Sequence, residues 1–298
     1  MTADAFHHST PSAFPDVLYE VGLKWSLKGA ALPRRLLWGV APTGPPHLGY
    51  VPHLLTSRRL QRAGCHTILL VADFHAYLDD EKAAWEELEV NSARYIADLA
   101  PSFSEVRRAA VDYLVPAYFE GLIRMSSRVP AQIALDAGDG TLRLALADRK
   151  VADILYTAMQ MYDLEYYDVD FALCGRDEAP IYEGAFAAIP GLGSSTSYAY
   201  LPVCPGVESD EMHASDSQSN KILLTASEAE VQESLSRHVE VHAVPWWACP
   251  LPTYLNESIV PLVIDLYPEL SQLLTNGRAG SVVELGTLTA AALEQLRS

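Results

Sequence analysis

The sequence of 298 residues is poor in cysteine and has no long apolar run. Its four cysteines lie far apart without a Cys-x-x-Cys pair, so they indicate no zinc site and suit a reducing compartment. No stretch approaches the roughly 18 apolar residues of a membrane-spanning helix. The polar segment from Met1 to about Pro15 lacks the apolar core of a secretory signal. We therefore expect a cytoplasmic protein with no membrane partner and no metal-ligand cluster.

Basic side chains are also scarce. Lys and Arg number 21 against 38 Asp and Glu, which gives a net charge of −17. This charge argues against broad electrostatic binding of nucleic acid, although the total does not exclude a local basic patch. Arg58, Arg59 and Arg62 come together near the end of one expected helix. There, cations more often complement the helix dipole than form a basic face.

Hydrophobic residues make up 49% of the chain, enough for a sizeable core. Apolar strand-like runs alternate with segments of helical spacing, which predicts an α/β fold with a doubly wound, Rossmann-like parallel sheet. The expected strands are 34–40, 65–73, 105–114, 170–175 and 198–203. The expected helices are 14–31, 47–62, 82–100, a segment ending at 124, 151–167 and 226–239. We expect a tail and lead-in helix over 1–30, a catalytic domain over 31–225 and a short helical region over 226–298.

The chain is organised around the segment LWGVAPTGPPHLGY, residues 37–50. It begins as a buried strand, breaks at prolines and glycines, and restarts as a helix near His47. A strand, a tight loop and a helix N-terminus present free backbone N–H groups and a favourable dipole, which suits a phosphate. A plain strand-turn-helix also carries Gly and Pro, so this segment alone leaves both interpretations open.

A second pattern lies on the expected helix 151–167. Tyr156, Gln160 and Asp163 are spaced by four and three residues, which places them on one helix face. Directed at a core, such a face needs hydrogen-bonding partners, as a binding site would supply. Directed at solvent, it is an ordinary polar face.

Four blocks in order resemble class I aminoacyl-tRNA synthetases, in particular the tyrosyl-tRNA synthetases of archaeal and eukaryotic type. They are WGVAPTGPPHLGY (38–50), ADFHAYLD (72–79), KVADILYTAMQMYDLEYYDVDFALCGRDE (150–178) and LPVCPG (201–206). The resemblance covers about Leu36 to Leu224. It implies a class I catalytic domain that uses ATP and Mg²⁺, and a homodimer whose surface falls near residues 112–134.

The resemblance also implies roles for individual residues. The catalytic positions of the phosphate motif are His47, Gly49 and Tyr50. The implied ATP-binding residues are Gly39, Ala41, Thr43, Gly44, His47, Gly175, Asp177 and Met212, with Asp177 near the ribose. The implied amino-acid-binding residues are Leu37, His75, Tyr156, Gln160, Asp163 and Glu178. Of these, Tyr156 and Gln160 match residues around the ammonium group, and Asp163 matches the acceptor of the tyrosine phenol.

Three departures from the family pattern bear on function. Glu211 stands where the second family motif has the lysine that stabilises pyrophosphate, so Lys221, Arg176 or a metal ion must take that role if ATP chemistry is kept. Leu37 replaces the family tyrosine at the substrate phenol, and Glu178 replaces a glutamine and adds a full negative charge near the ammonium group. Residues 222–298 carry three basic residues against nine acidic ones, which is unfavourable for tRNA binding.

These observations favour an enzyme that activates a tyrosine-like amino acid as its adenylate and transfers the acyl group to an acceptor other than tRNA. Two alternatives stay open. One is a non-catalytic relative that binds an amino acid. The other is a divergent but genuine tyrosine–tRNA ligase.

Overall fold

The computed structural model describes residues 24–26, 33–62, 64–79, 82–142, 150–189, 191, 195–201, 204 and 206–242. The predicted N-terminal tail, most of the predicted lead-in helix and the C-terminal region beyond residue 242 lie outside the described residues.

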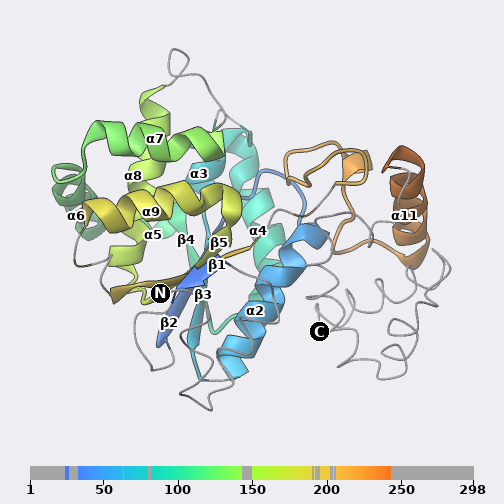
Figure 1. The fold of residues 1–298 in the computed structure, drawn as a ribbon, viewed down its shortest axis with the longest axis horizontal. Coiled ribbons are helices and arrows are strands. Elements are labelled where there is room, and N and C mark those ends of the chain that lie inside the picture. Colours follow the sequence, from blue (N-terminus) through green and yellow to red (C-terminus); the bar gives the residue numbers. More distant parts are fainter. Residues whose placement is uncertain are drawn as a thin grey trace.

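One mixed sheet lies at the centre of the molecule, with strand order β1-β6-β5-β2-β3-β4 (Figure 1). Its strands are β1 Lys24–Ser26, β2 Arg35–Val40, β3 His66–Val71, β4 Glu105–Arg108, β5 Phe171–Gly175 and β6 Ser197–Leu201. Strands β2 to β6 run parallel, and β1 pairs with β6 antiparallel. The chain builds outward from β2 on both sides, so the switch point of the topology lies between β2 and β5. The predicted doubly wound Rossmann-like fold is confirmed.

Helices cover both faces of this sheet because its central strands are apolar on both faces. In β2, Leu36 and Trp38 pack into one core and Leu37 packs into the other. Figure 1 shows α2 and α4 on one side and α6, α8 and α9 on the other. The longer helices are α2 Val51–Arg62, α4 Leu88–Leu99, α6 Pro116–Ser126, α7 Ala131–Leu142, α8 Val151–Tyr166, α9 Ala179–Ala188 and α11 Glu228–His242.

Shorter helical elements complete the described chain. The short α-helices are α3 Asp73–Leu78 and α5 Ala109–Asp112. The 3₁₀ turns are η2 Leu48–Tyr50, η3 Trp85–Glu87, η4 Ala100–Ser102, η6 Arg176–Glu178 and η7 Gln218–Asn220. Turns η2 and η6 follow β2 and β5 and place polar side chains at the switch point.

Two predictions of secondary structure were wrong. Residues Lys24–Ser26, inside the predicted lead-in helix, form strand β1, where pairing with β6 satisfies their backbone groups instead of a helix. The strand predicted over 105–114 ends at Arg108, and the chain turns into α5, because the Asp73 carboxylate accepts a hydrogen bond from the Ala110 N–H at 2.7 Å.

Candidate functional site

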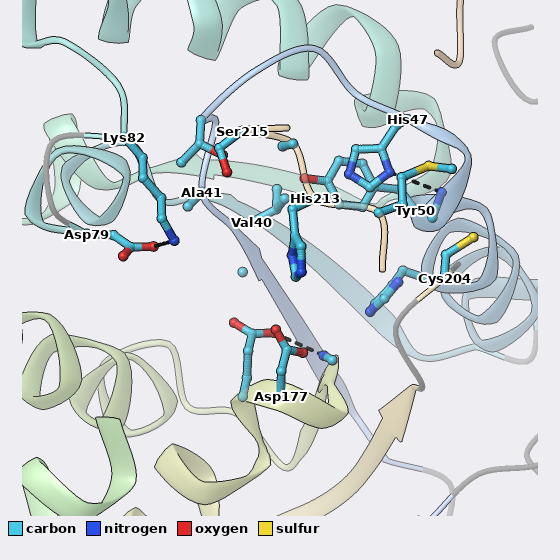
Figure 2. A pocket seen from close by; sticks show the side chains of 18 of the residues that line it. Val40, Ala41, His47, Tyr50, Asp79, Lys82, Asp177, Cys204, His213 and Ser215 are labelled. Atoms are coloured by element: carbon cyan, nitrogen blue, oxygen red, sulfur yellow. Dashed lines mark hydrogen bonds and ion pairs between the residues drawn. The ribbon is translucent and has the colours of Figure 1, made fainter. Parts of the chain in front are cut away.

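A cavity of about 340 Å³ opens at the carboxyl ends of β2 and β5 (Figure 2). This volume lies in the range of small-molecule sites, and the position is where open α/β sheets bind ligands. We call it the large cavity. The predicted site residues that line it are Gly39, Ala41, Thr43, His47, Gly49, Tyr50, Tyr156, Gly175, Asp177, Glu178 and Met212.

His47 is the best-defined donor of the large cavity. It caps η2, and its Nδ1 accepts a hydrogen bond from the Gly49 N–H at 3.2 Å. Burial, aided by nearby Lys221 and His213, lowers the pKa of His47 to about 3, so the imidazole is neutral. Because Nδ1 accepts, the proton lies on Nε2, which is buried without a partner among the described residues. His47 thus lines the cavity with a neutral ring whose buried Nε2–H has no partner among the described residues.

Tyr50 and Gly44 shape the surroundings of that donor. The centroid of the Tyr50 ring lies 4.3 Å from that of the His47 ring, and the Tyr50 hydroxyl pairs with the Tyr95 hydroxyl at 3.1 Å. Tyr50 is thus held in place and packs against the imidazole. Gly44 lies outside the cavity lining, where a Cβ would clash with the Ala214 carbonyl oxygen. A side chain at Gly44 would therefore push the loop around Ala214 away from the site.

A small cavity of about 40 Å³ adjoins the large one on the β2 side. All six residues predicted to bind the amino acid line it: Leu37, His75, Tyr156, Gln160, Asp163 and Glu178. The face predicted for Tyr156, Gln160 and Asp163 on α8 is therefore directed into the protein, and these side chains are buried. The polar residues of α8 belong to a site and not to a solvent-exposed face.

Glu178 and Gln160 form the polar end of this cavity. Gln160 Nε2 donates to Glu178 Oε1 at 3.0 Å, the Gly175 N–H donates to Glu178 Oε2 at 3.0 Å, and Gln160 Oε1 is buried without a partner among the described residues. Burial and the Asp177 carboxylate raise the pKa of Glu178 to about 8. Burial therefore disfavours the full negative charge predicted from the sequence, and a bound cation would favour it.

Asp163 lies at the opposite end and is occupied by two tyrosines that sequence reasoning missed. The Tyr113 hydroxyl donates to Asp163 Oδ2 at 2.5 Å, and the Tyr118 hydroxyl donates to Oδ1 at 2.8 Å. Burial raises the pKa of Asp163 to about 7, although both phenols favour the carboxylate. No spacing rule links these residues, because they lie 50 and 45 positions apart in sequence.

The segment carrying Glu211 folds into an ordered loop, residues 206–221, over the large cavity. Glu211 pairs with His213 at 3.0 Å, and His213 lines the cavity. Leu48 N–H donates to the Ile222 carbonyl at 2.8 Å, so the end of the loop is tied to η2. The Glu211 side chain therefore has a hydrogen-bond partner within its own loop.

Two lysine side chains lie at or near the large cavity, although Glu211 replaces the lysine of the family motif. Lys221 is buried, and its Nζ donates to the Ala214 carbonyl at 2.7 Å beside Gly44. Lys82 lines the cavity itself and pairs with Asp79 at 2.8 Å, on the side opposite His47 in Figure 2. Arg176 is exposed and does not line either cavity. Lys82 was not singled out from the sequence, although it follows the ADFHAYLD block closely.

Asn220 holds the 206–221 loop together. Its side chain accepts from the Glu208 N–H at 2.7 Å and donates to Ser209 Oγ, the Glu211 carbonyl and Asp216 Oδ2 at 2.8 to 3.1 Å. We expect Asn220→Ala to speed cleavage within the loop by a Glu-specific protease about tenfold, since the lost bonds amount to roughly 1–3 kcal/mol of local stability. Gln218→Ala, an exposed neighbour, is the control. Equal cleavage rates in both variants would contradict this role.

The described residues contain neither a group of metal-ligating side chains nor a helix suited to crossing a membrane. Among the residues that the structure describes, no three His, Cys, Asp or Glu side chains are grouped to hold a metal ion. None of the described helices has the length and apolar character needed to cross a membrane.

A switch-point cavity with a second cavity beside it, in a doubly wound sheet, is the arrangement of a ligand-binding α/β protein. Residues 31–248 match the model of the class I tRNA synthetases (W and Y), and the chain belongs to that family.

Individual relatives within this family are tyrosine–tRNA ligases. The chain is 31% identical over 232 residues to the cytoplasmic tyrosine–tRNA ligase of Xenopus tropicalis, covering 74% of this chain and 43% of that protein. It is 29% identical to the tyrosine–tRNA ligase of Haloarcula marismortui, covering 67% and 60%. The chain thus spans less than two thirds of these relatives. A tyrosyl-tRNA synthetase from Archaeoglobus fulgidus, complexed with L-tyrosine, has the same fold with a TM-score of 0.71 at 20% identity, covering 96% of this chain and 99% of that one.

Proposed function

We propose that the chain activates an amino acid with ATP, forming an aminoacyl-adenylate and releasing pyrophosphate. The observation that carries this proposal is the pairing of two cavities. One presents the unpartnered His47 Nε2 donor, and the other presents the unpartnered Gln160 Oε1 acceptor beside Glu178. A phosphate needs the first and an ammonium group needs the second. Family membership supports the same reaction.

The proposed reaction requires positioning more than covalent chemistry. A carboxylate oxygen of the amino acid attacks the α-phosphorus of ATP, and the bond to the β-phosphate oxygen breaks as pyrophosphate leaves with the electron pair. His47 donates to a phosphate oxygen, and Lys82 and Lys221 provide positive charge near the triphosphate. Asp177 accepts from ribose hydroxyls, as the resemblance implies. Mg²⁺ would enter with the triphosphate and neutralise its charge.

The proposed reaction also needs an acceptor for the acyl group. The relatives are tyrosine–tRNA ligases, which favours a divergent genuine ligase over the non-tRNA acceptor predicted from the charge. The net charge of −17 is the observation that keeps a small-molecule acceptor as a second candidate. The names of the relatives also support a cytoplasmic location.

ATP–pyrophosphate exchange with each of the twenty amino acids tests the adenylation step. We expect exchange with at least one amino acid, and no exchange with any would refute the proposal. Aminoacylation of total tRNA with the amino acid that supports exchange then separates the two acceptors. Charged tRNA would support the ligase, and exchange without charging would support a different acceptor.

Binding of that amino acid should depend on pH through Glu178. Below its raised pKa of about 8, Glu178 is neutral and must lose a proton to hold an ammonium group. The apparent affinity should therefore rise by up to about tenfold per pH unit below pH 8 and level off above it. Calorimetry from pH 6 to 9 measures this, with Glu178→Gln as the variant that loses the slope. A flat profile in the unmodified protein would contradict the assignment.

We also propose that the chain forms a homodimer through α6 and its flanks. Leu114, Phe119 and Ile123 expose 73%, 61% and 55% of their surface, and Phe119 and Ile123 share a helix face. We expect Phe119→Asp to yield a monomer of 32.6 kDa in light scattering where the unmodified chain gives twice that mass. Val90→Asp, at a position equally exposed on α4, should stay dimeric. A monomeric unmodified chain would refute this proposal.

A further inference from the structure

We propose that the buried unit of Tyr113, Asp163 and Tyr118 closes the side-chain end of the amino-acid cavity, so that the chain selects an amino acid with a short side chain and excludes tyrosine. This inference rests on the proposed function, because it names the substrate class of the same site. It departs from the substrate that the names of the relatives suggest. It follows from hydrogen bonds, volume and wall chemistry in the small cavity.

Both oxygens of Asp163 are occupied within the protein. The resemblance to tyrosyl-tRNA synthetases implies that this carboxylate accepts the substrate phenol. Here its two oxygens accept phenols from Tyr113 and Tyr118. Asp163 is 3% exposed and the two tyrosines 6% and 1%, so the three groups form a closed buried unit. A substrate phenol would have to displace one of two charge-assisted hydrogen bonds.

The Tyr113 ring is fixed in place by its neighbours. It stacks on the Tyr118 ring with centroids 4.1 Å apart and an interplanar angle of 15°. Its other neighbours are Phe74 and the cavity-lining His75, both in edge contact at 6.3 and 5.8 Å. Swinging Tyr113 away would break these contacts together with its bond to Asp163. Tyr113 is therefore fixed in place beside Asp163, which lines the cavity.

The small cavity has too little volume for a phenol ring. The small cavity measures about 40 Å³ on a scale where one water molecule needs roughly 10–15 Å³, so it has room for about three waters. A phenol ring needs far more. The ammonium group of a ligand would take part of this space at the Gln160 and Glu178 end, which leaves even less room for a side chain.

The side chains that line the small cavity also disfavour a phenol at its side-chain end. Leu37 is 2% exposed and stands where the family tyrosine would contact the substrate phenol, so it offers no hydrogen bond there. Leu70 and Ala72 line the same cavity. The unpartnered acceptor Gln160 Oε1 lies at the Glu178 end, where an ammonium group fits. The walls are therefore mixed, because His75, Tyr156 and Tyr182 line the same cavity, but the position of the family tyrosine is apolar.

The test measures binding and exchange separately. Calorimetry with alanine, serine, valine and tyrosine should show a short-chain amino acid binding at least tenfold more tightly than tyrosine. Tyr113→Ala frees Asp163 Oδ2 and the space of the ring while Tyr118 still pairs with Asp163 Oδ1, so tyrosine affinity should rise at least tenfold. Tyr113→Phe keeps the ring and should still discriminate against tyrosine. Tyr113→Leu is the second variant if Tyr113→Ala does not fold, as checked by circular dichroism.

The outcomes separate this inference from the proposed function. Preferred binding of tyrosine by the unmodified chain, or an unchanged preference in both Tyr113→Ala and Tyr113→Leu, would overturn the inference. Exchange with tyrosine would support adenylation and overturn the inference. Tight binding of a short amino acid without exchange would refute adenylation and support the inference. Binding of no amino acid would overturn both.

Discussion

His47→Ala should lower the rate of amino-acid-dependent ATP–pyrophosphate exchange by about 10²–10³-fold, the usual cost of one preorganised donor to a developing oxyanion. The physical reason is the fixed tautomer. Gly49 holds Nδ1 as an acceptor, so Nε2–H is the only donor of this ring and has no competing protein partner among the described residues. Steady-state exchange at saturating ATP measures the loss as a fall in kcat.

His66→Ala is the matched control, because His66 is a partly exposed histidine that pairs with Glu105 away from both cavities. It should leave exchange within twofold. Thermal unfolding of both variants separates loss of catalysis from loss of fold, since His47 is buried against Tyr50. If folded His47→Ala retained full exchange, the assignment of the phosphate site would be wrong.

Asp163→Ala should lower the free energy of unfolding by about 3–5 kcal/mol, because it leaves two buried phenol donors without their charged acceptor. Asp163→Asn should cost less, since its amide oxygen still accepts one of the two. Urea unfolding followed by circular dichroism gives both values as shifts in the midpoint.

The control for this prediction is Asp136→Ala, which removes an exposed carboxylate from α7. Its effect should stay within about 0.5 kcal/mol. A loss below about 1 kcal/mol in Asp163→Ala would show that the phenols find other partners, and it would also weaken the case that Tyr113 is held in place.

Much of the fold could be predicted because parallel strands buried on both faces are apolar throughout. The strands expected at 34–40, 65–73 and 170–175 appear as β2, β3 and β5 within a few residues. Strand β1 could not be predicted in this way. Three residues at a sheet edge have no periodicity of their own, and their structure depends on pairing with β6, more than 170 residues away.

The candidate site shows the same division between local and distant information. Tyr156, Gln160 and Asp163 lie about one helical turn apart along α8, so their common face follows from helical geometry alone. Tyr113 and Tyr118 reach Asp163 from other elements, and nothing in their spacing indicates a contact. The pKa of Glu178 likewise depends on burial, which a sequence comparison of glutamate with glutamine does not report.

One competition experiment tests the central claim most directly. The purified chain is incubated with ATP, Mg²⁺ and an equimolar mixture of the twenty amino acids, and the adenylate retained on the protein is identified by mass spectrometry. We predict an aminoacyl-adenylate of a short-chain amino acid, absent from His47→Ala. Tyrosyl-adenylate as the main product would contradict the closed pocket, and the absence of any adenylate would contradict amino-acid activation itself.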